Sequence, residues 1–328
     1  MKKKIAVLLT AALTGACLFA GCGSKADTSA ATADTKETVQ ATEEESTEEA
    51  VAEEIATEQK TENASDKVIL VVSFGTSYND SRDITIGAIE NAVTAAFPEY
   101  EVRRAFTSQI IIDKLKDRDG LEIDNVEEAL DRAVADGVKT LVVQPTHLMS
   151  GFEYTDLKDA LDTYQDKFEQ VVLAEPLLSS DADYEAVAQA ITAETASYDD
   201  GETAICFMGH GTEADSNADY AKLQEVLNAD GFENYYIGTV EASPSVEDLL
   251  AELNASGKYK KVVLKPLMVV AGDHANNDMA GDEEDSWKTQ FEAAGYEVNC
   301  IIEGLGQDEA VCNIYVSHTQ AAIDSLEK

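Results

Sequence analysis

The feature that most constrains this chain is a regular alternation of apolar, β-like segments with amphipathic helical segments from residue 67 onward. The apolar segments are short and rich in Val, Ile and Leu, as in "KVILVVSF" and "KKVVLKPLMVV", and helical patterns follow them. Strands of a parallel sheet that is covered by helices on both faces are apolar almost throughout, because neither face meets water. The alternation therefore predicts an α/β fold built on parallel sheets.

The alternation occurs twice, and short motifs recur in the same order in both halves. "LVVSFGTS" corresponds to "CFMGHGTE", and "VVQPTHLMSGFEY" corresponds to "VLKPLMVVAGDHA". In this alignment Ser108 falls at the place of Glu241, and Glu153 falls at the place of His274. We interpret the pattern as an internal duplication that gives two similar Rossmann-like lobes facing a cleft. Open α/β sheets bind ligands at the carboxyl ends of their strands, so we expect the functional site there.

The sequence divides into five predicted parts. They are a lipoprotein signal peptide (1–22), a disordered acidic tether (23–66), an N-terminal α/β lobe (67–199), a C-terminal α/β lobe (200–312) and a closing C-terminal helix (313–328). The leader has three lysines, a short apolar run and Cys22 in a setting that resembles the lipobox of bacterial lipoproteins. The tether has almost no large apolar side chain, so burial cannot offset its ordering entropy, although a charged surface helix within it is an alternative.

The leader predicts an exported protein whose lipid anchor at Cys22 holds it on the outer face of the cytoplasmic membrane. The sequence has 64 acidic and 24 basic residues, for a net charge of −40. Such a field repels nucleic acid and favours cationic ligands, so we expect no nucleic-acid partner. Three cysteines of the body, Cys206, Cys300 and Cys312, lack a C-x-x-C spacing, which argues against a disulfide framework or a zinc knuckle.

Three residues with metal-binding side chains follow predicted strands of the second half: His210, Glu241 and His274. Because carboxyl ends of parallel strands share one edge of a sheet, these side chains are expected to converge. Glu153, at the place equivalent to His274, would reach in from the opposite lobe. Two imidazoles with one or two carboxylates suit a divalent ion such as Co²⁺, Ni²⁺, Fe²⁺ or Zn²⁺, and the ligand types do not choose among them.

Each of these residues also has a plainer interpretation. A single histidine at a strand end often packs in the core, and Glu241 could cap the helix expected near 243–245. His147 could line the cleft or pack beside it. Asp278 could hydrogen-bond its own loop, and "DEEDSW" (282–287) could form the acidic first turn of a helix. The joint placement of the four candidate ligands at equivalent strand ends favours a metal site.

Longer segments strengthen this interpretation. "LVVSFGTSYNDSR", "FMGHG", "GTVEASPSVEDLL" and "PLMVVAGDHANNDMAGDEEDSWK" resemble the anaerobic sirohydrochlorin cobaltochelatases of the CbiK family, over essentially all of residues 67–320. The resemblance implies the class II chelatase fold and insertion of Co²⁺ into sirohydrochlorin for anaerobic cobalamin biosynthesis, without an organic cofactor. It also implies metal ligands at His210, Glu241, His274 and Glu153. Because imidazole can accept a proton near neutral pH, we expect His210 and His274 to be catalytic, and the donor types leave Ni²⁺ or Fe²⁺ as alternative ions.

A lipid anchor and a two-lobed body also fit a surface lipoprotein that binds haem, another tetrapyrrole or a metal for transport without catalysis. The His and Glu constellation favours the enzyme, whereas the exported location favours capture. Sirohydrochlorin carries many carboxylates, which conflicts with the acidic body. We therefore expect Arg82, Arg103, Arg104 or Lys265 to form a local basic rim for the substrate.

Overall fold

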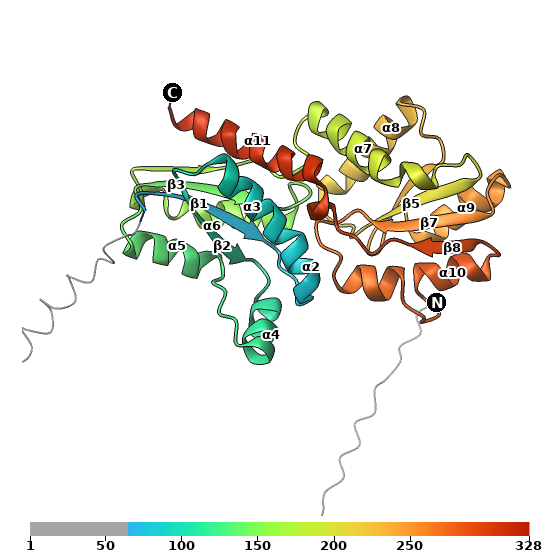
Figure 1. Cartoon of the computed structure of the whole chain (residues 1–328), viewed down its shortest axis with the longest axis horizontal. Coiled ribbons are helices and arrows are strands. Elements are labelled where there is room, and N and C mark those ends of the chain that lie inside the picture. Colours follow the sequence, from blue (N-terminus) through green and yellow to red (C-terminus); the bar gives the residue numbers. More distant parts are fainter. Residues whose placement is uncertain (1–64, 328) are drawn as a thin grey trace, which may run out of the picture. The chain divides into compact units, whose positions relative to one another are not determined.

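Two four-stranded parallel sheets form the framework of the computed structural model, which describes residues 65–327 (Figure 1). The order is β2-β1-β3-β4 in the first sheet and β6-β5-β7-β8 in the second, with every neighbouring pair parallel. The strands are β1 (Lys67–Ser73), β2 (Glu101–Phe106), β3 (Thr140–Pro145), β4 (Gln170–Leu173), β5 (Thr203–Gly209), β6 (Tyr235–Thr239), β7 (Lys261–Pro266) and β8 (Glu297–Cys300). The predicted α/β fold with two similar lobes is confirmed.

Helices connect the strands and cover the sheets. They are α2 (Asn79–Ile84), α3 (Ile86–Ala96), α4 (Gln109–Asp119), α5 (Val126–Ala135), α6 (Phe152–Asp162), α7 (Asp181–Thr195), α8 (Ala218–Ala229), α9 (Val246–Ser256), α10 (Trp287–Ala293) and α11 (Glu309–Leu326). None of the helices in residues 65–327 has both the length and the apolar character that a membrane crossing requires. The predicted signal peptide, Cys22 and nearly all of the predicted tether lie outside the described residues.

Local capping rules set where several helices begin. α5, α7 and α9 start with capping boxes at Asn125, Ser180 and Ser245, in which side chains satisfy otherwise unpaired backbone N–H groups. The prediction that 282–287 forms an acidic first turn is wrong. The hydroxyl of Ser286 accepts a hydrogen bond from the Thr289 backbone N–H, so α10 begins only at Trp287 and the acidic residues precede it.

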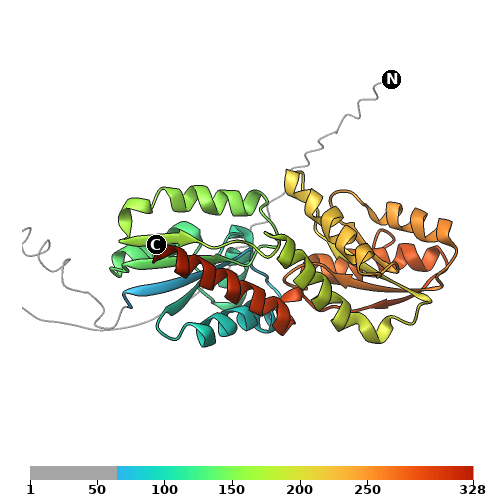
Figure 2. The same ribbon diagram turned by 90° about the horizontal axis from the view of Figure 1, so that it is seen from above.

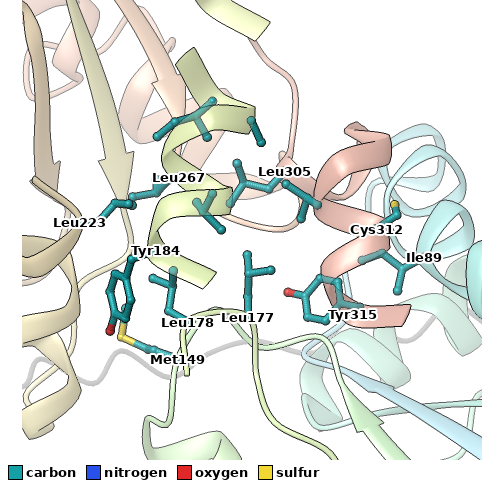
Figure 3. Close-up of a cluster of buried hydrophobic side chains, with 14 of the residues drawn as sticks. Ile89, Met149, Leu177, Leu178, Tyr184, Leu223, Leu267, Leu305, Cys312 and Tyr315 are labelled. Carbon is teal, nitrogen blue, oxygen red and sulfur yellow. The ribbon is translucent and has the colours of Figure 1, made fainter. Parts of the chain in front are cut away.

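The two sheets share one apolar core. One face of each sheet packs within its own lobe, whereas the other faces join a larger buried cluster that spans both lobes. Figure 3 shows the middle of this shared core, where Leu177, Leu305 and Tyr315 point toward one another. The Tyr315 hydroxyl donates to the carbonyl of Thr146 at 2.9 Å, so a polar group in the shared core is satisfied.

Two helices cross between the lobes (Figures 1 and 2). α7 follows the first sheet but packs against α8 of the second lobe, and α11 ends the second half but packs against α3, β3 and β4 of the first. Each crossing helix is anchored by the third strand of the sheet it covers. The Thr319 hydroxyl of α11 donates to Gln144 of β3 at 2.8 Å, and Lys265 of β7 donates to Glu194 of α7 at 3.1 Å. The exchanged helices fix the two sets of strand ends against each other.

Candidate metal centre

The strand register defines equivalent positions in the two lobes. Val72 of β1 pairs with Pro145 of β3, and Met208 of β5 pairs with Pro266 of β7. Ser73 pairs with Phe106 of β2, just as Gly209 pairs with Thr239 of β6. Counting onward from these pairs places His210, Glu241 and His274 at three carboxyl ends of the second sheet. Their counterparts on the first sheet are Phe74, Ser108 and Glu153.

The structure brings His210, Glu241 and His274 together. One potential ligand atom from each residue lies within 4.8 Å of those of the other two. The imidazole rings of His210 and His274 have centroids 4.7 Å apart and stand at 86° to each other. Nε2 of His210 lies 3.9 Å from Oε1 of Glu241. A single ion of the size of Co²⁺ can be shared by donors at such spacings after small side-chain adjustments.

Hydrogen bonds on the far side of each ring set its tautomer. Nδ1 of His210 lies 2.8 Å from the carbonyl oxygen of Gly211, and Nδ1 of His274 lies 2.7 Å from Oδ2 of Asp278. Both oxygens can only accept, so each Nδ1 carries the proton and donates it. In the neutral imidazole this leaves the Nε2 lone pair free, which is the form that binds a metal ion. Both histidines are therefore pre-set as Nε2 ligands.

A glycine allows the β5 and β6 loops to meet. Gly211 has φ +87, and a Cβ added there would lie 2.8 Å from the Ala242 backbone nitrogen and side chain, so only glycine fits. The Glu241 backbone N–H donates to the His210 carbonyl at 2.9 Å, which ties the two ligand-bearing loops together. Glu241 does not cap α9, because Ser245 does so. Its carboxylate is therefore free to face the two rings.

The β7 loop positions the second histidine through a short, wide helical turn. His274 immediately precedes a π-helical turn, Ala275–Met279, and such turns occur often at functional sites. The turn brings the carboxylate of Asp278, four residues on, within hydrogen-bonding distance of Nδ1 of His274, instead of leaving it to bond its own backbone as the sequence suggested. The i, i+4 spacing of His274 and Asp278 was the available signal for this pair, and it was missed.

Glu153 lies outside the group formed by His210, Glu241 and His274. It sits in the exposed first turn of α6, on the lobe opposite the histidines. A Cβ built on Gly151 would lie 3.7 Å from the Glu153 carboxylate and also 3.7 Å from the Ser216 hydroxyl of the second lobe. The Glu153 side chain therefore reaches the boundary between the lobes without joining the three convergent ligands.

His147, which follows β3, is enclosed. Neither ring nitrogen has a hydrogen-bond partner within the described residues, and both nitrogens are shielded from solvent. Burial lowers its pKa from 6.5 to about 4, and the negative charge of Glu153 opposes that shift. His147 is consequently a neutral imidazole near pH 7, held beside the strand end that carries Glu153.

The prediction that Arg82, Arg103, Arg104 or Lys265 forms a basic rim is wrong for Lys265 and Arg82, which are buried, and Arg103 and Arg104 are already paired with carboxylates. Lys265 is fully buried in β7, where it binds Glu194 and Glu303. Arg103 pairs with Glu101 and Asp136, Arg104 pairs with Glu90, and Arg82 is buried beside Asn79 and Asp83. Asp83 and Glu101 are close to their arginines in the sequence, whereas Glu90, Asp136, Glu194 and Glu303 come from other elements and could not be inferred from position along the chain.

Some solved structures have the same fold as this chain, and other known proteins are similar to it in sequence. SirB from Bacillus subtilis with Fe³⁺ superposes with a TM-score of 0.56 at 13% identity, covering 80% of this chain and 98% of SirB. SirB from B. subtilis subspecies spizizenii in complex with cobalt gives 0.54 at 12% identity, covering 80% and 97%. These likenesses show that the chain has the two-lobed, parallel-sheet fold of these chelatases.

The sequence assigns it further: the chain belongs to the cobalt chelatase (CbiK) family, whose model matches residues 67–324. A sirohydrochlorin cobaltochelatase from Salmonella typhimurium is 40% identical over 258 residues, 79% of this chain and 97% of that protein. The sirohydrochlorin cobaltochelatase CbiKC from Nitratidesulfovibrio vulgaris is 32% identical over 263 residues, 80% and 92%. The predicted family membership is confirmed.

Proposed function

We propose that this protein inserts Co²⁺ into sirohydrochlorin. The observation that carries the proposal is the convergence of His210, Glu241 and His274 in a CbiK-family chain. Two relatives that this chain matches over most of their length are named sirohydrochlorin cobaltochelatases. Nitrogen and oxygen donors in this combination suit Co²⁺, and they also accept Ni²⁺ and Fe²⁺, so availability of the ion would select cobalt.

The proposed roles follow from the free lone pairs. Nε2 of His210, Nε2 of His274 and a carboxylate oxygen of Glu241 replace water on one side of Co²⁺ and leave its other side open. Side-chain exposures of 47%, 59% and 32% for His210, Glu241 and His274 let the ion enter from solvent. The ring of the tetrapyrrole then approaches the open side, so that its nitrogens exchange with the protein ligands one at a time.

Proton balance fits two histidines. Sirohydrochlorin must lose two N–H protons as it binds Co²⁺, and each imidazole that gives up the ion exposes an Nε2 lone pair that can accept one. The hydrogen bonds from Nδ1 to Gly211 and Asp278 stabilise the resulting imidazolium rings. Glu153, on the facing lobe, is proposed to carry protons from the macrocycle to solvent or to act as a further ligand during transfer.

An absorbance assay tests the proposal. Purified protein mixed with sirohydrochlorin and Co²⁺ should convert the macrocycle spectrum catalytically, whereas His210→Ala and His274→Ala should not. Glu241→Gln should also lose activity, because it removes the carboxylate ligand. Its matched control, Glu225→Gln on the exposed face of α8, should be as active as the wild type. Binding of sirohydrochlorin in one-to-one amount without metal insertion would contradict the enzyme and favour the capture protein.

We also propose that the protein is exported and lipid-anchored at Cys22. The support is the leader sequence, with three lysines, an apolar run and a small-residue site before this cysteine. Metabolic labelling with a fatty acid should mark the wild-type chain and not Cys22→Ser. Cys17, the other cysteine of the leader, serves as the control, and a Cys17→Ser variant should be labelled as strongly as the wild type. Loss of label in Cys17→Ser would place the anchor at Cys17 and contradict the proposal.

A further inference from the structure

A second concave site lies between the lobes, beside the β7 loop that carries His274. The cavity has a volume of about 480 Å³, within the range of ligand pockets. Both lobes line the cavity. The first lobe contributes residues 77–81, Ile84, Lys114 and Arg118, and the second contributes Ala271, Asn276, Ile302 and Gln307. The hydroxyl of Tyr78, in the cavity wall, donates to Oδ1 of Asp273 at 3.3 Å, and Asp273 directly precedes His274 in the chain.

One face of α4 turns two cations toward this cavity. Lys114 and Arg118 are four residues apart and therefore share a face of the helix, and Ile110 precedes them by another four. Lys114 has no ion-pair partner among residues 65–327. Arg118 bonds Asp119 and Asn79 through Nε and Nη2, which leaves Nη1 without a hydrogen bond in the same part of the chain. The stripe thus offers two donors for an anion.

Apolar surface accompanies these cations. Ile84 and Ile302, which line the cavity from opposite lobes, are 51% and 43% exposed, and Ile110 is 79% exposed. Large apolar side chains left this open beside a cavity are typical of a binding site for an apolar partner. Phe74, the first-lobe counterpart of His210, is half exposed and accepts a backbone hydrogen bond from Ser108 beside the first turn of α4.

We infer that the Ile110–Lys114–Arg118 stripe recognises the substrate: Lys114 and Arg118 bind peripheral carboxylates of the tetrapyrrole while Ile84, Ile110 and Ile302 contact its ring edge. This inference rests on the proposed function, because it takes sirohydrochlorin as the ligand. Lys114 and Arg118 are the two basic side chains among the cavity-lining residues, and Asp80 is the single acidic one, within a strongly acidic protein. Asp119 pairs with Arg118 from outside the lining, so Lys114 and Nη1 of Arg118, both unpaired among residues 65–327, are the groups that attract an anion. A carboxylate-rich substrate would therefore meet attraction at this place and repulsion over most of the remaining surface.

The test is a binding measurement that does not depend on catalysis. Metal-free sirohydrochlorin is titrated into the full chain by fluorescence quenching, for the wild type, for Lys114→Gln/Arg118→Gln, and for the control Lys116→Gln. Lys116 lies on the same helix but faces the groove along β2 and pairs with Glu122. The double variant should bind about tenfold or more weakly, because each lost cation removes a charge-assisted hydrogen bond to a carboxylate.

Two further readouts separate recognition from folding and from catalysis. Co²⁺ affinity of the double variant should equal that of the wild type, since His210, Glu241 and His274 are untouched. The dependence of sirohydrochlorin affinity on NaCl concentration should be weaker in the double variant than in the wild type. Unchanged sirohydrochlorin affinity in a double variant, with a wild type that inserts cobalt, would overturn the inference and leave the proposed function standing.

The converse result separates the two proposals in the other direction. A wild type that binds sirohydrochlorin through Lys114 and Arg118 but never inserts Co²⁺ would overturn the proposed reaction and support the recognition stripe. Equal weakening by Lys116→Gln and by the double variant would show that bulk charge, not this face of α4, attracts the substrate. That result would also overturn the inference.

Discussion

The two lobes repeat one strand order but present different chemistry at the same strand ends. The second lobe places His210, Glu241 and His274 where the first places Phe74, Ser108 and Glu153. All the arginines of the sequence, in contrast, lie in the first lobe: Arg82, Arg103, Arg104, Arg118 and Arg132. The comparison shows how a duplicated scaffold can divide one task, with the proposed cation site on the second lobe and, on the first, the Lys114 and Arg118 side chains that are proposed to bind an anionic ring.

The same division is visible inside the sheets. Gln144 of β3 and Lys265 of β7 occupy equivalent positions, and each holds the helix that crosses from the other half. The first lobe uses a neutral hydrogen bond for this purpose, whereas the second buries an ammonium between Glu194 and Glu303. A position close by differs as well, since the titratable His147 of the first lobe is equivalent to Met268 in the alignment of the two halves.

The largest effect is expected when the second lobe is given a residue of the first. His210→Phe copies Phe74 and removes one of the Nε2 ligands, so the rate of cobalt insertion should fall by roughly 10²–10⁴-fold, the range for loss of a proton-transfer group. The measurement is the absorbance assay at saturating Co²⁺. The reverse change, Phe74→His, should leave cobalt stoichiometry at one ion per chain, because Ser108 supplies no carboxylate. A second bound ion would break the comparison.

The next largest effect concerns the buried anchors. Lys265→Met leaves the partly buried Glu194 without its cation and should lower the free energy of unfolding by about 3 kcal/mol, the lower end of the range for a broken buried pair, because Glu194 keeps some contact with solvent. Gln144→Leu, at the equivalent position, should cost only about 1–2 kcal/mol, because it removes neutral hydrogen bonds to Thr319 and the Glu175 carbonyl, while the Thr319 hydroxyl can still donate to the Tyr315 carbonyl. Urea denaturation of both variants checks the difference. Lys265→Met combined with Glu194→Gln should recover part of the loss, and equal costs for the two single variants would contradict the contrast.

A pH-dependent contrast follows from His147. Burial holds the pKa of this imidazole at about 4 in the folded protein, below its ordinary value of 6.5. The unfolded chain therefore binds a proton between these values while the folded chain does not, and stability falls as the pH drops from 6.5 to 4. The loss amounts to about 3 kcal/mol. His147→Met, which copies Met268, should flatten this part of the stability curve, and an unchanged slope would refute the assignment.

The smallest effect is predicted for the support of His274. Asp278→Ala removes the carboxylate that holds the Nδ1 proton and should weaken Co²⁺ binding by about 10–100-fold, as for other partners of metal-ligating histidines. Isothermal titration with Co²⁺ measures the change. Glu284→Ala, an exposed acidic residue shortly after it in the chain, is the control and should bind Co²⁺ as the wild type does. The same loss in both variants would show that only overall charge matters.

The sequence predicted the framework and the convergent residues because both depend on local patterns. Buried parallel strands require continuous apolar runs, and the residue directly after such a run lies at the sheet edge, as His210 does after β5. His274 lies further on, in the loop that follows β7. Glu241 followed from the alignment of the two halves. Contacts between segments far apart in sequence were beyond reach, since an apolar pattern marks a buried face without naming its partner. The burial of Lys265 beside Glu194 and the enclosure of His147 are contacts of this kind.

The proposed reaction depends on His210, Glu241 and His274 binding one cobalt ion in common. This shared binding is tested with crystals of the protein soaked in Co²⁺, from which anomalous scattering is recorded at the cobalt absorption edge. One strong peak is expected at bonding distance from Nε2 of both histidines and from a carboxylate oxygen of Glu241. A principal peak bound to only one of these residues, or located elsewhere on the acidic surface, would contradict it.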